Sequence, residues 1–143
     1  MEPKTTTAAP PRWRIWLQAI RPESFTASMV PVFLGAALVP FLARSGRWTL
    51  FPLVVIASLS IHAATNLMNE YTDFKKGVDR ADTYGDSRVL VEHLLKPRQV
   101  FIGSLLLFAL TACIGLVFVV IRGRPILLLG LIGIAGGLFY SAA

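Results

Sequence analysis

Four long apolar segments, separated by polar stretches, constrain the fold more than any other feature of this chain. They cover residues 24–43, 49–71, 99–121 and 125–143. Each approaches the roughly 20 apolar residues that a helix needs to cross the hydrocarbon core of a bilayer. Because lipid offers no hydrogen-bonding partner to the backbone, spans of this length must be helical. The segments therefore predict an all-α fold, a multi-pass transmembrane helical bundle.

The composition supports a membrane protein and argues against other classes. Only 15% of the residues are charged and the mean hydropathy is +0.63, whereas a soluble domain carries about 25% charged residues. The net charge of +6 comes from basic residues that lie between the apolar segments, and this distribution argues against nucleic acid as a partner. The single cysteine, Cys113, permits no internal disulfide.

Two segments precede the first apolar stretch. Residues 1–11 are rich in Thr, Ala and Pro and are predicted to form a disordered tail. Residues 12–21 place Trp13 and Trp16 beside arginines. This pattern is typical of a short helix in the membrane interface and equally of the flank of a span.

The basic residues predict the orientation in the membrane. Ten belong to the N-terminal flank or to the loop between the second and third segments: Lys4, Arg12, Arg14, Arg21, Lys75, Lys76, Arg80, Arg88, Lys96 and Arg98. The other four, Arg44, Arg47, Arg122 and Arg124, fall on the opposite side. Because cytoplasmic loops carry the excess of Lys and Arg, we expect the N-terminus and the long loop to be cytoplasmic, in a multi-pass protein of the cell inner (cytoplasmic) membrane.

A row of polar side chains closes the second apolar segment. Asn66, Asn69, Glu70 and Asp73 are spaced i, i+3, i+4 and i+7, so on a helix they form one stripe. Carboxylates at membrane depth are costly and usually mark an ion or substrate site. Clustered hard oxygen ligands suit Mg²⁺, which often binds through one or two carboxylates together with substrate phosphates. The row therefore predicts a magnesium site.

The following loop adds groups that suit a phosphate. Asp79 offers a further carboxylate once the helix has ended near Gly77, and Lys76 and Arg88 are cations that can pair with phosphate oxygens. A metal bridged to a diphosphate neutralises the charge of that leaving group. In a membrane protein this combination points to an amphiphilic diphosphate. His62, one turn before Asn66, is predicted to be a hydrogen-bonded helix contact rather than a catalyst.

The same residues resemble the first aspartate-rich motif of the UbiA superfamily of intramembrane prenyltransferases. The similarity lies in Asn66-x-x-Asn69-Glu70-Tyr71-x-Asp73-Phe74-x-x-Gly77-x-Asp79. This form is most similar to the 1,4-dihydroxy-2-naphthoate polyprenyltransferase branch. Four further segments resemble that branch: residues 16–22, 27–31, 84–90 and 139–142. Two positions depart from the pattern, since Glu70 stands where aspartate is more frequent and His93 where a small residue is usual.

The resemblance implies a bundle of nine spans that transfers a polyprenyl group from a prenyl diphosphate to an aromatic acceptor, 1,4-dihydroxy-2-naphthoate, in menaquinone biosynthesis. By position it implies Mg²⁺ as cofactor and three groups of site residues. These are Asp73 and Asn69 as catalytic residues, Asn66, Lys76 and Arg88 as diphosphate contacts, and Asn69, Glu70, Asp73 and Asp79 as metal ligands.

Only four of the nine expected spans and one of two aspartate-rich motifs occur in this chain. We therefore expect residues 12–143 to be the N-terminal part of such a domain and to be inactive alone. A truncated gene product, an incomplete reading frame and one piece of a split protein with a second-half polypeptide as its partner all stay open. Two alternatives stay open, a non-catalytic membrane subunit and a small cation transporter. A transporter predicts ionisable groups near the middle of a span, whereas these carboxylates crowd at one end.

Overall fold

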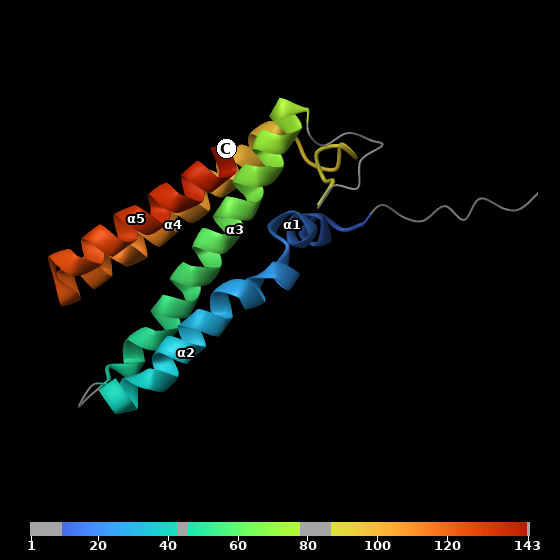
Figure 1. The fold of residues 1–143 in the computed structure, drawn as a ribbon. Coiled ribbons are helices and arrows are strands. Elements are labelled where there is room, and N and C mark those ends of the chain that lie inside the picture. Colours follow the sequence, from blue (N-terminus) through green and yellow to red (C-terminus); the bar gives the residue numbers. More distant parts are fainter. Residues whose placement is uncertain (1–9, 43–45, 78–86, 143) are drawn as a thin grey trace, which may run out of the picture.

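The computed structural model describes residues 10–42, 46–77 and 87–142, and within these ranges the chain is helical without any strand (Figure 1). The predicted tail, apart from Pro10 and Pro11, and the predicted ligand Asp79 lie outside the described residues. The helices, of which η1 and η2 are single 3₁₀ turns, are α1 (Arg12–Ile20), η1 (Pro22–Phe25), α2 (Thr26–Leu42), η2 (Trp48–Leu50), α3 (Phe51–Lys76), α4 (Pro97–Arg122) and α5 (Arg124–Ala142).

The long helices follow the predicted apolar segments closely, with one informative difference. Helix α3 continues five residues past the predicted end at position 71 and stops at Lys76. Gly77 then adopts a left-handed conformation (φ 68°), and its N–H bonds to the carbonyl oxygens of Asp73 and Phe74. Glycine adopts this conformation without the steric penalty of a Cβ. The expected helix end near Gly77 is confirmed, and the polar row is helical throughout.

The segment before the first span forms a helix of its own. Helix α1 ends at Arg21, which is left-handed (φ 56°) and donates its N–H to the carbonyl of Leu17. The chain then turns through η1 into α2. Figure 1 shows α1 as a short helix beside the C-terminal half of α3, set at an angle to α2. Residues 12–20 are therefore not a straight extension of the first span.

The best-packed core lies at the end of the bundle that carries the polar row. It joins α1, α3, the loop before α4 and α4 itself through buried apolar side chains: Ile15, Ala19, Leu67, Val89, Leu90, Leu95 and Val100. Gly103 lets Trp16 approach, because a Cβ at position 103 would lie 3.0 Å from Trp16 Cζ3. Ser104 Oγ donates to the carbonyl of Ala64 at 2.7 Å. These contacts hold α1, α3 and α4 together around the candidate site.

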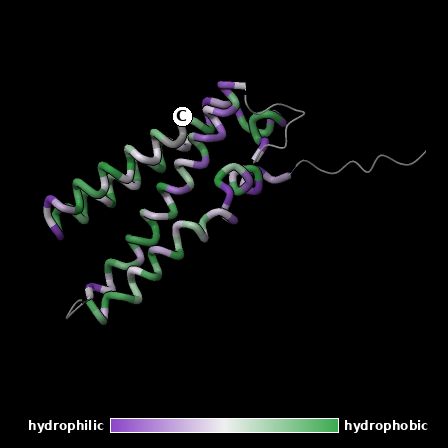
Figure 2. The backbone as a smooth tube through the Cα atoms, viewed as in Figure 1, coloured by the Kyte–Doolittle hydropathy of each residue, from purple (hydrophilic) through white to green (hydrophobic). Residues whose placement is uncertain are grey.

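Three stretches of the described chain are long and apolar enough to cross a membrane: Arg12–Leu42, Trp48–Lys76 and Pro97–Arg122. The apolar part of α5, Arg124–Gly137, is shorter, so the fourth span stays a prediction. Large apolar side chains face outward, as at Phe41 (84% exposed) and Val120 (87%). In Figure 2 apolar residues cover most of α2, α4 and α5, and polar residues gather towards the C-terminal end of α3. This distribution is typical of helices in contact with lipid.

Candidate cation and diphosphate site

The polar row of α3 lines a cavity of about 600 Å³ that η1, α2 and α5 complete. Asn66, Asn69 and Asp73 line it together with His62, one turn earlier. The other walls come from residues before and within α2 and from glycines of α5: Arg21, Ser24, Ala27, Ser28, Gly133 and Gly137. Since these glycines carry no side chain, the wall that α5 provides is set back. The structure thus brings three of the four residues of the predicted stripe into one site.

Asn66 is buried and its amide nitrogen is fully used. Nδ2 donates to the carbonyl oxygen of Ile20 at 2.8 Å and to Ser24 Oγ at 3.0 Å. A primary amide has two N–H groups, so none remains for a ligand. The amide oxygen accepts no hydrogen bond within the described part of the chain. Asn66 therefore offers the cavity an oxygen rather than a donor.

His62 is held by hydrogen bonds to two hydroxyl groups. Its Nε2 lies 3.0 Å from Ser24 Oγ and its Nδ1 lies 2.5 Å from Ser28 Oγ. The ring of Phe25 packs edge-on at 5.3 Å between ring centroids. The expectation that His62 is a hydrogen-bonded helix contact is confirmed. Sequence reasoning missed both serines, since nothing in their spacing showed that they meet His62.

Asn69 and Asp73 line the cavity with side chains that have no partner among the described residues. Among the described residues, neither the Asn69 amide nor the Asp73 carboxylate makes a hydrogen bond or an ion pair. Both side chains are half-buried. A carboxylate that lines a cavity without a protein partner can bind a ligand that supplies positive charge. Arg21 lines the same cavity, and its charge suits an anionic group beside that cation.

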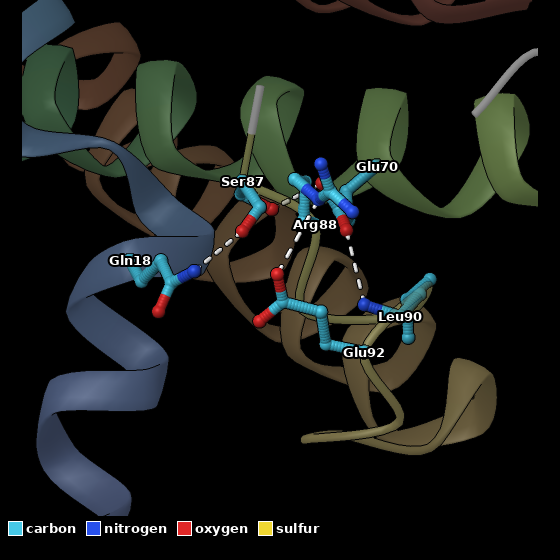
Figure 3. Close-up of polar contacts among 6 residues, drawn as sticks. All are labelled: Gln18, Glu70, Ser87, Arg88, Leu90 and Glu92. Atoms are coloured by element: carbon cyan, nitrogen blue, oxygen red, sulfur yellow. Dashed lines mark hydrogen bonds and ion pairs between the residues drawn. The ribbon is translucent and has the colours of Figure 1, made fainter. Parts of the chain in front are cut away.

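Glu70 lies apart from the other three members of the row. It is buried, and its carboxylate accepts hydrogen bonds from Ser87 Oγ and from the backbone N–H of Leu90, at 3.2 Å for the latter (Figure 3). Gln18 Nε2 donates to the carbonyl oxygen of Ser87 at 2.6 Å. Both carboxylate oxygens of Glu70 therefore hold the loop before α4 against α3. This arrangement separates Glu70 from Asp73, although the sequence places both on one stripe.

The predicted diphosphate contacts from the loop lie outside the cavity lining. Lys76 is exposed in the last turn of α3. Arg88 has a left-handed backbone (φ 58°) and its Nε lies 3.3 Å from Glu92 Oε1. Of the residues predicted to contact diphosphate, the structure thus brings only Asn66 to the cavity. Arg21, for which no role was predicted, is the arginine that lines it.

The residues of the cavity fit a hard divalent cation. Within the described ranges no group of three or more His, Cys, Asp and Glu side chains lies together, so a cage made of carboxylates is not formed there. Asp73, Asn69 and the amide oxygen of Asn66 instead offer one carboxylate and amide oxygens. Mg²⁺ is commonly held by one or two carboxylates, with waters and substrate phosphates completing its shell. The donor set matches that pattern.

Comparison with known proteins agrees with these features. Residues 28–143 match the UbiA prenyltransferase family. The chain is 35% identical over 127 residues to "1,4-dihydroxy-2-naphthoate octaprenyltransferase" of Bacillus subtilis, covering 89% of this chain and 40% of that protein. It is 40% identical over 95 residues to "UbiA prenyltransferase domain-containing protein 1" of Xenopus tropicalis, covering 66% of this chain and 27% of that protein, and 38% identical over 99 residues to the human protein of the same name.

The chain spans about two fifths of the length of the Bacillus relative and about a quarter of the vertebrate ones. No solved structure matches it. The family match covers most of the chain and includes α3 with its polar row. The resemblance expected from Asn66 to Asp79 is confirmed, and the chain belongs to the UbiA prenyltransferase family.

Proposed function

We propose that this chain supplies the cation- and diphosphate-binding part of a membrane enzyme that transfers a polyprenyl group from a prenyl diphosphate to 1,4-dihydroxy-2-naphthoate in menaquinone biosynthesis. One observation carries the proposal. A single cavity at the end of a long apolar helix contains the uncommitted carboxylate of Asp73, the amides of Asn69 and Asn66, and Arg21. The name of the Bacillus relative, a 1,4-dihydroxy-2-naphthoate octaprenyltransferase, supports the choice of acceptor.

Each residue of the cavity has a distinct task in this proposal. Asp73, Asn69 and Asn66 would hold Mg²⁺, which neutralises charge on the diphosphate as the carbon–oxygen bond to the prenyl group breaks. Arg21, which lines the same cavity, would stabilise the anionic diphosphate. The set-back wall at Gly133 and Gly137 leaves room beside these groups, and about 600 Å³ is within the range of small-molecule sites.

Other charged residues of the chain have different roles in this proposal. We assign Lys76 and Arg88 to attracting the anionic substrate to this end of the bundle, because charged groups act over distances longer than direct contact. Asp79 remains a predicted metal ligand, and so does Glu70, whose carboxylate must leave Ser87 and Leu90 to reach a metal. The basic N-terminal flank and loop favour a cytoplasmic position for this end in the inner membrane. The remaining part of the domain, in the same or in a second polypeptide, would complete the cavity.

A chimera tests the function without assuming that this chain is active alone. In it, the 127 matched residues replace the corresponding part of the Bacillus relative. Transfer of a polyprenyl group to 1,4-dihydroxy-2-naphthoate is then measured in membranes against Mg²⁺ concentration. We expect Asp73→Asn to lower turnover by about a hundredfold or more, since one preorganised electrostatic contact at a developing charge contributes this much.

The matched control is Glu23→Gln, which neutralises an exposed carboxylate at the same end of the bundle that does not line the cavity. It should transfer the prenyl group as the parent chimera does. Full turnover by the Asp73→Asn chimera would refute the site assignment. A parent chimera that inserts into membranes and binds the diphosphate with Mg²⁺ but transfers nothing would support the non-catalytic subunit instead.

A further inference from the structure

Ser24 Oγ makes three hydrogen bonds, for which it has one hydrogen to donate and two lone pairs that accept. Ser24 Oγ donates its single hydrogen to the carbonyl oxygen of Arg21 at 2.8 Å. With the hydroxyl hydrogen on that carbonyl, the two other contacts of Ser24 Oγ, Asn66 Nδ2 and His62 Nε2, each at 3.0 Å, donate to it. The hydroxyl group thus uses its one hydrogen and both lone pairs. This arrangement determines which atoms of Asn66 and His62 donate hydrogen bonds.

The direction of these bonds also fixes the tautomer of His62. Since Nε2 donates to Ser24, this nitrogen carries the hydrogen, and Nδ1 of the neutral ring accepts from Ser28 Oγ. The left-handed Arg21 and the 3₁₀ turn η1 present the Arg21 carbonyl to the Ser24 hydroxyl. The Arg21 carbonyl thereby ties the network to backbone geometry. A His62 ring with its hydrogen on Nδ1 would require the Ser24 hydroxyl to leave this carbonyl.

The amide of Asn66 cannot exchange its oxygen and nitrogen at low cost. After such a flip, the amide oxygen would stand about where Nδ2 now lies, 2.8 Å from the carbonyl oxygen of Ile20, and two acceptors would face each other. The contact with Ser24 would also fail, because the hydroxyl hydrogen is engaged with Arg21. Two hydrogen bonds would be lost, and the N–H groups would turn towards the cavity. The observed orientation is strongly preferred.

We infer that Ser24 and His62 are positioning residues that hold the Asn66 amide with its oxygen towards the cavity, so that Asn66 contacts the cation and not the diphosphate. The inference rests on the proposed function for the nature of the ligand. It changes the role that the sequence suggested for Asn66, because an oxygen without a hydrogen attracts a cation and repels phosphate oxygens. Asn66 and Asp73 then act on the same ion.

The test uses the full 143-residue chain in lipid nanodiscs, with Mn²⁺ as the metal probe and inorganic pyrophosphate as the anion. Bound Mn²⁺ is measured by electron paramagnetic resonance. The hydrogen exchange of the Asn66 side-chain amide is followed by nitrogen-15 NMR, with Asn66→Asp to assign its signals. The second readout does not depend on metal or on activity.

Ser24→Ala should weaken Mn²⁺ binding about tenfold, the lower end of the effect of removing a group that orients a metal ligand, and should speed exchange of the Asn66 amide. Ser24→Thr keeps the hydroxyl and should restore both properties. Thr26→Ala removes an exposed hydroxyl from the same turn and should leave both unchanged. Among the residues that the structure describes, this hydroxyl bonds only to the Glu23 carbonyl. His62→Gln, which retains an N–H donor, should bind Mn²⁺ better than His62→Ala.

Two results would overturn the inference separately from the proposed function. Wild-type chain that binds Mn²⁺ while Ser24→Ala binds it equally well would show that the amide orientation has no role in metal binding. Unchanged exchange of the Asn66 amide in Ser24→Ala would show that Ser24 does not hold it. Absence of Mn²⁺ binding by the wild-type chain, with or without pyrophosphate, would instead contradict the proposed cation site itself and the cation role of Asn66 with it.

Discussion

Replacing Glu70 by alanine should release the loop before α4 while leaving the cavity side of α3 in place. Glu70 is the residue of the polar row whose carboxylate is fully committed within the protein, to Ser87 Oγ and to the Leu90 N–H. The apolar neighbours Val89 and Leu90 are buried in the core with α1 and α4. Figure 3 shows how this carboxylate reaches both loop residues from α3.

The expected cost follows from the burial of all three partners. Glu70 is 5% exposed, Ser87 2% and Leu90 1%, so water does not readily replace the lost acceptor. A buried donor without a partner costs about 1–3 kcal/mol, and two donors lose theirs, so Glu70→Ala should destabilise the closed loop by roughly 2–6 kcal/mol. Glu70→Gln keeps one acceptor oxygen for Leu90 and an amide group that can donate to Ser87, so it should cost less.

Hydrogen exchange at the Leu90 amide, measured by mass spectrometry or NMR in nanodiscs, checks this. Because about 1.4 kcal/mol corresponds to a factor of ten, the lower bound of about 2 kcal/mol means that Glu70→Ala should speed exchange at Leu90 at least about thirtyfold. The control Glu92→Ala removes an exposed partner of Arg88, which contributes less than about 1 kcal/mol, and should change little. Unchanged exchange in Glu70→Ala would refute the clamp. Faster exchange in wild-type protein on adding Mg²⁺ and pyrophosphate would show Glu70 leaving the loop for the metal.

Two further predictions concern the cavity wall and the orientation. Gly137→Val should weaken binding of a prenyl diphosphate to the chimera, because a Cβ there would already lie 3.1 Å from a hydroxyl oxygen of α3. Calorimetry measures this binding. The control Gly130→Val, where nothing lies within 4 Å of the added Cβ, should bind the prenyl diphosphate normally. In a Cys113→Ser background, a membrane-impermeant maleimide should label Glu92→Cys only from the cytoplasmic side and Trp48→Cys only from the other side. The reverse labelling would contradict the proposed orientation.

Hydropathy and length predicted the long helices, because a chain that enters lipid must satisfy its backbone within the helix. They could not predict where α3 ends. Polar residues lower the hydropathy from Asn66 onward, yet each of them still continues the helical hydrogen bonding up to Gly77. Hydropathy also could not separate α1 from the first span, since that break depends on the left-handed Arg21.

The candidate site was partly predictable from spacing. With 3.6 residues per turn, Asp73 lies about 20° from Asn66 around the helix axis and Glu70 about 40° to the other side. All three fit one broad stripe, so spacing alone could not tell which would face the cavity. The loop residues Ser87 and Leu90 decide it by binding Glu70. Ser24 and Arg21 were not predictable as partners of the row because the turn at η1 brings them there.

The two sides of α3 depend on each other energetically. A ligand site must leave polar groups such as Asn69 and Asp73 without internal partners, and this lowers stability until a ligand binds. The opposite side, where Glu70 and the apolar core fasten the loop and α1, provides compensating stability. A variant at Glu70 should therefore weaken cation binding at the proposed site only indirectly, and exchange at Leu90 should become faster at the same time. Ser24→Ala should weaken cation binding while exchange at Leu90 stays unchanged. Measuring cation binding and Leu90 exchange together therefore distinguishes a residue that supports α3 from a residue that orients a metal ligand.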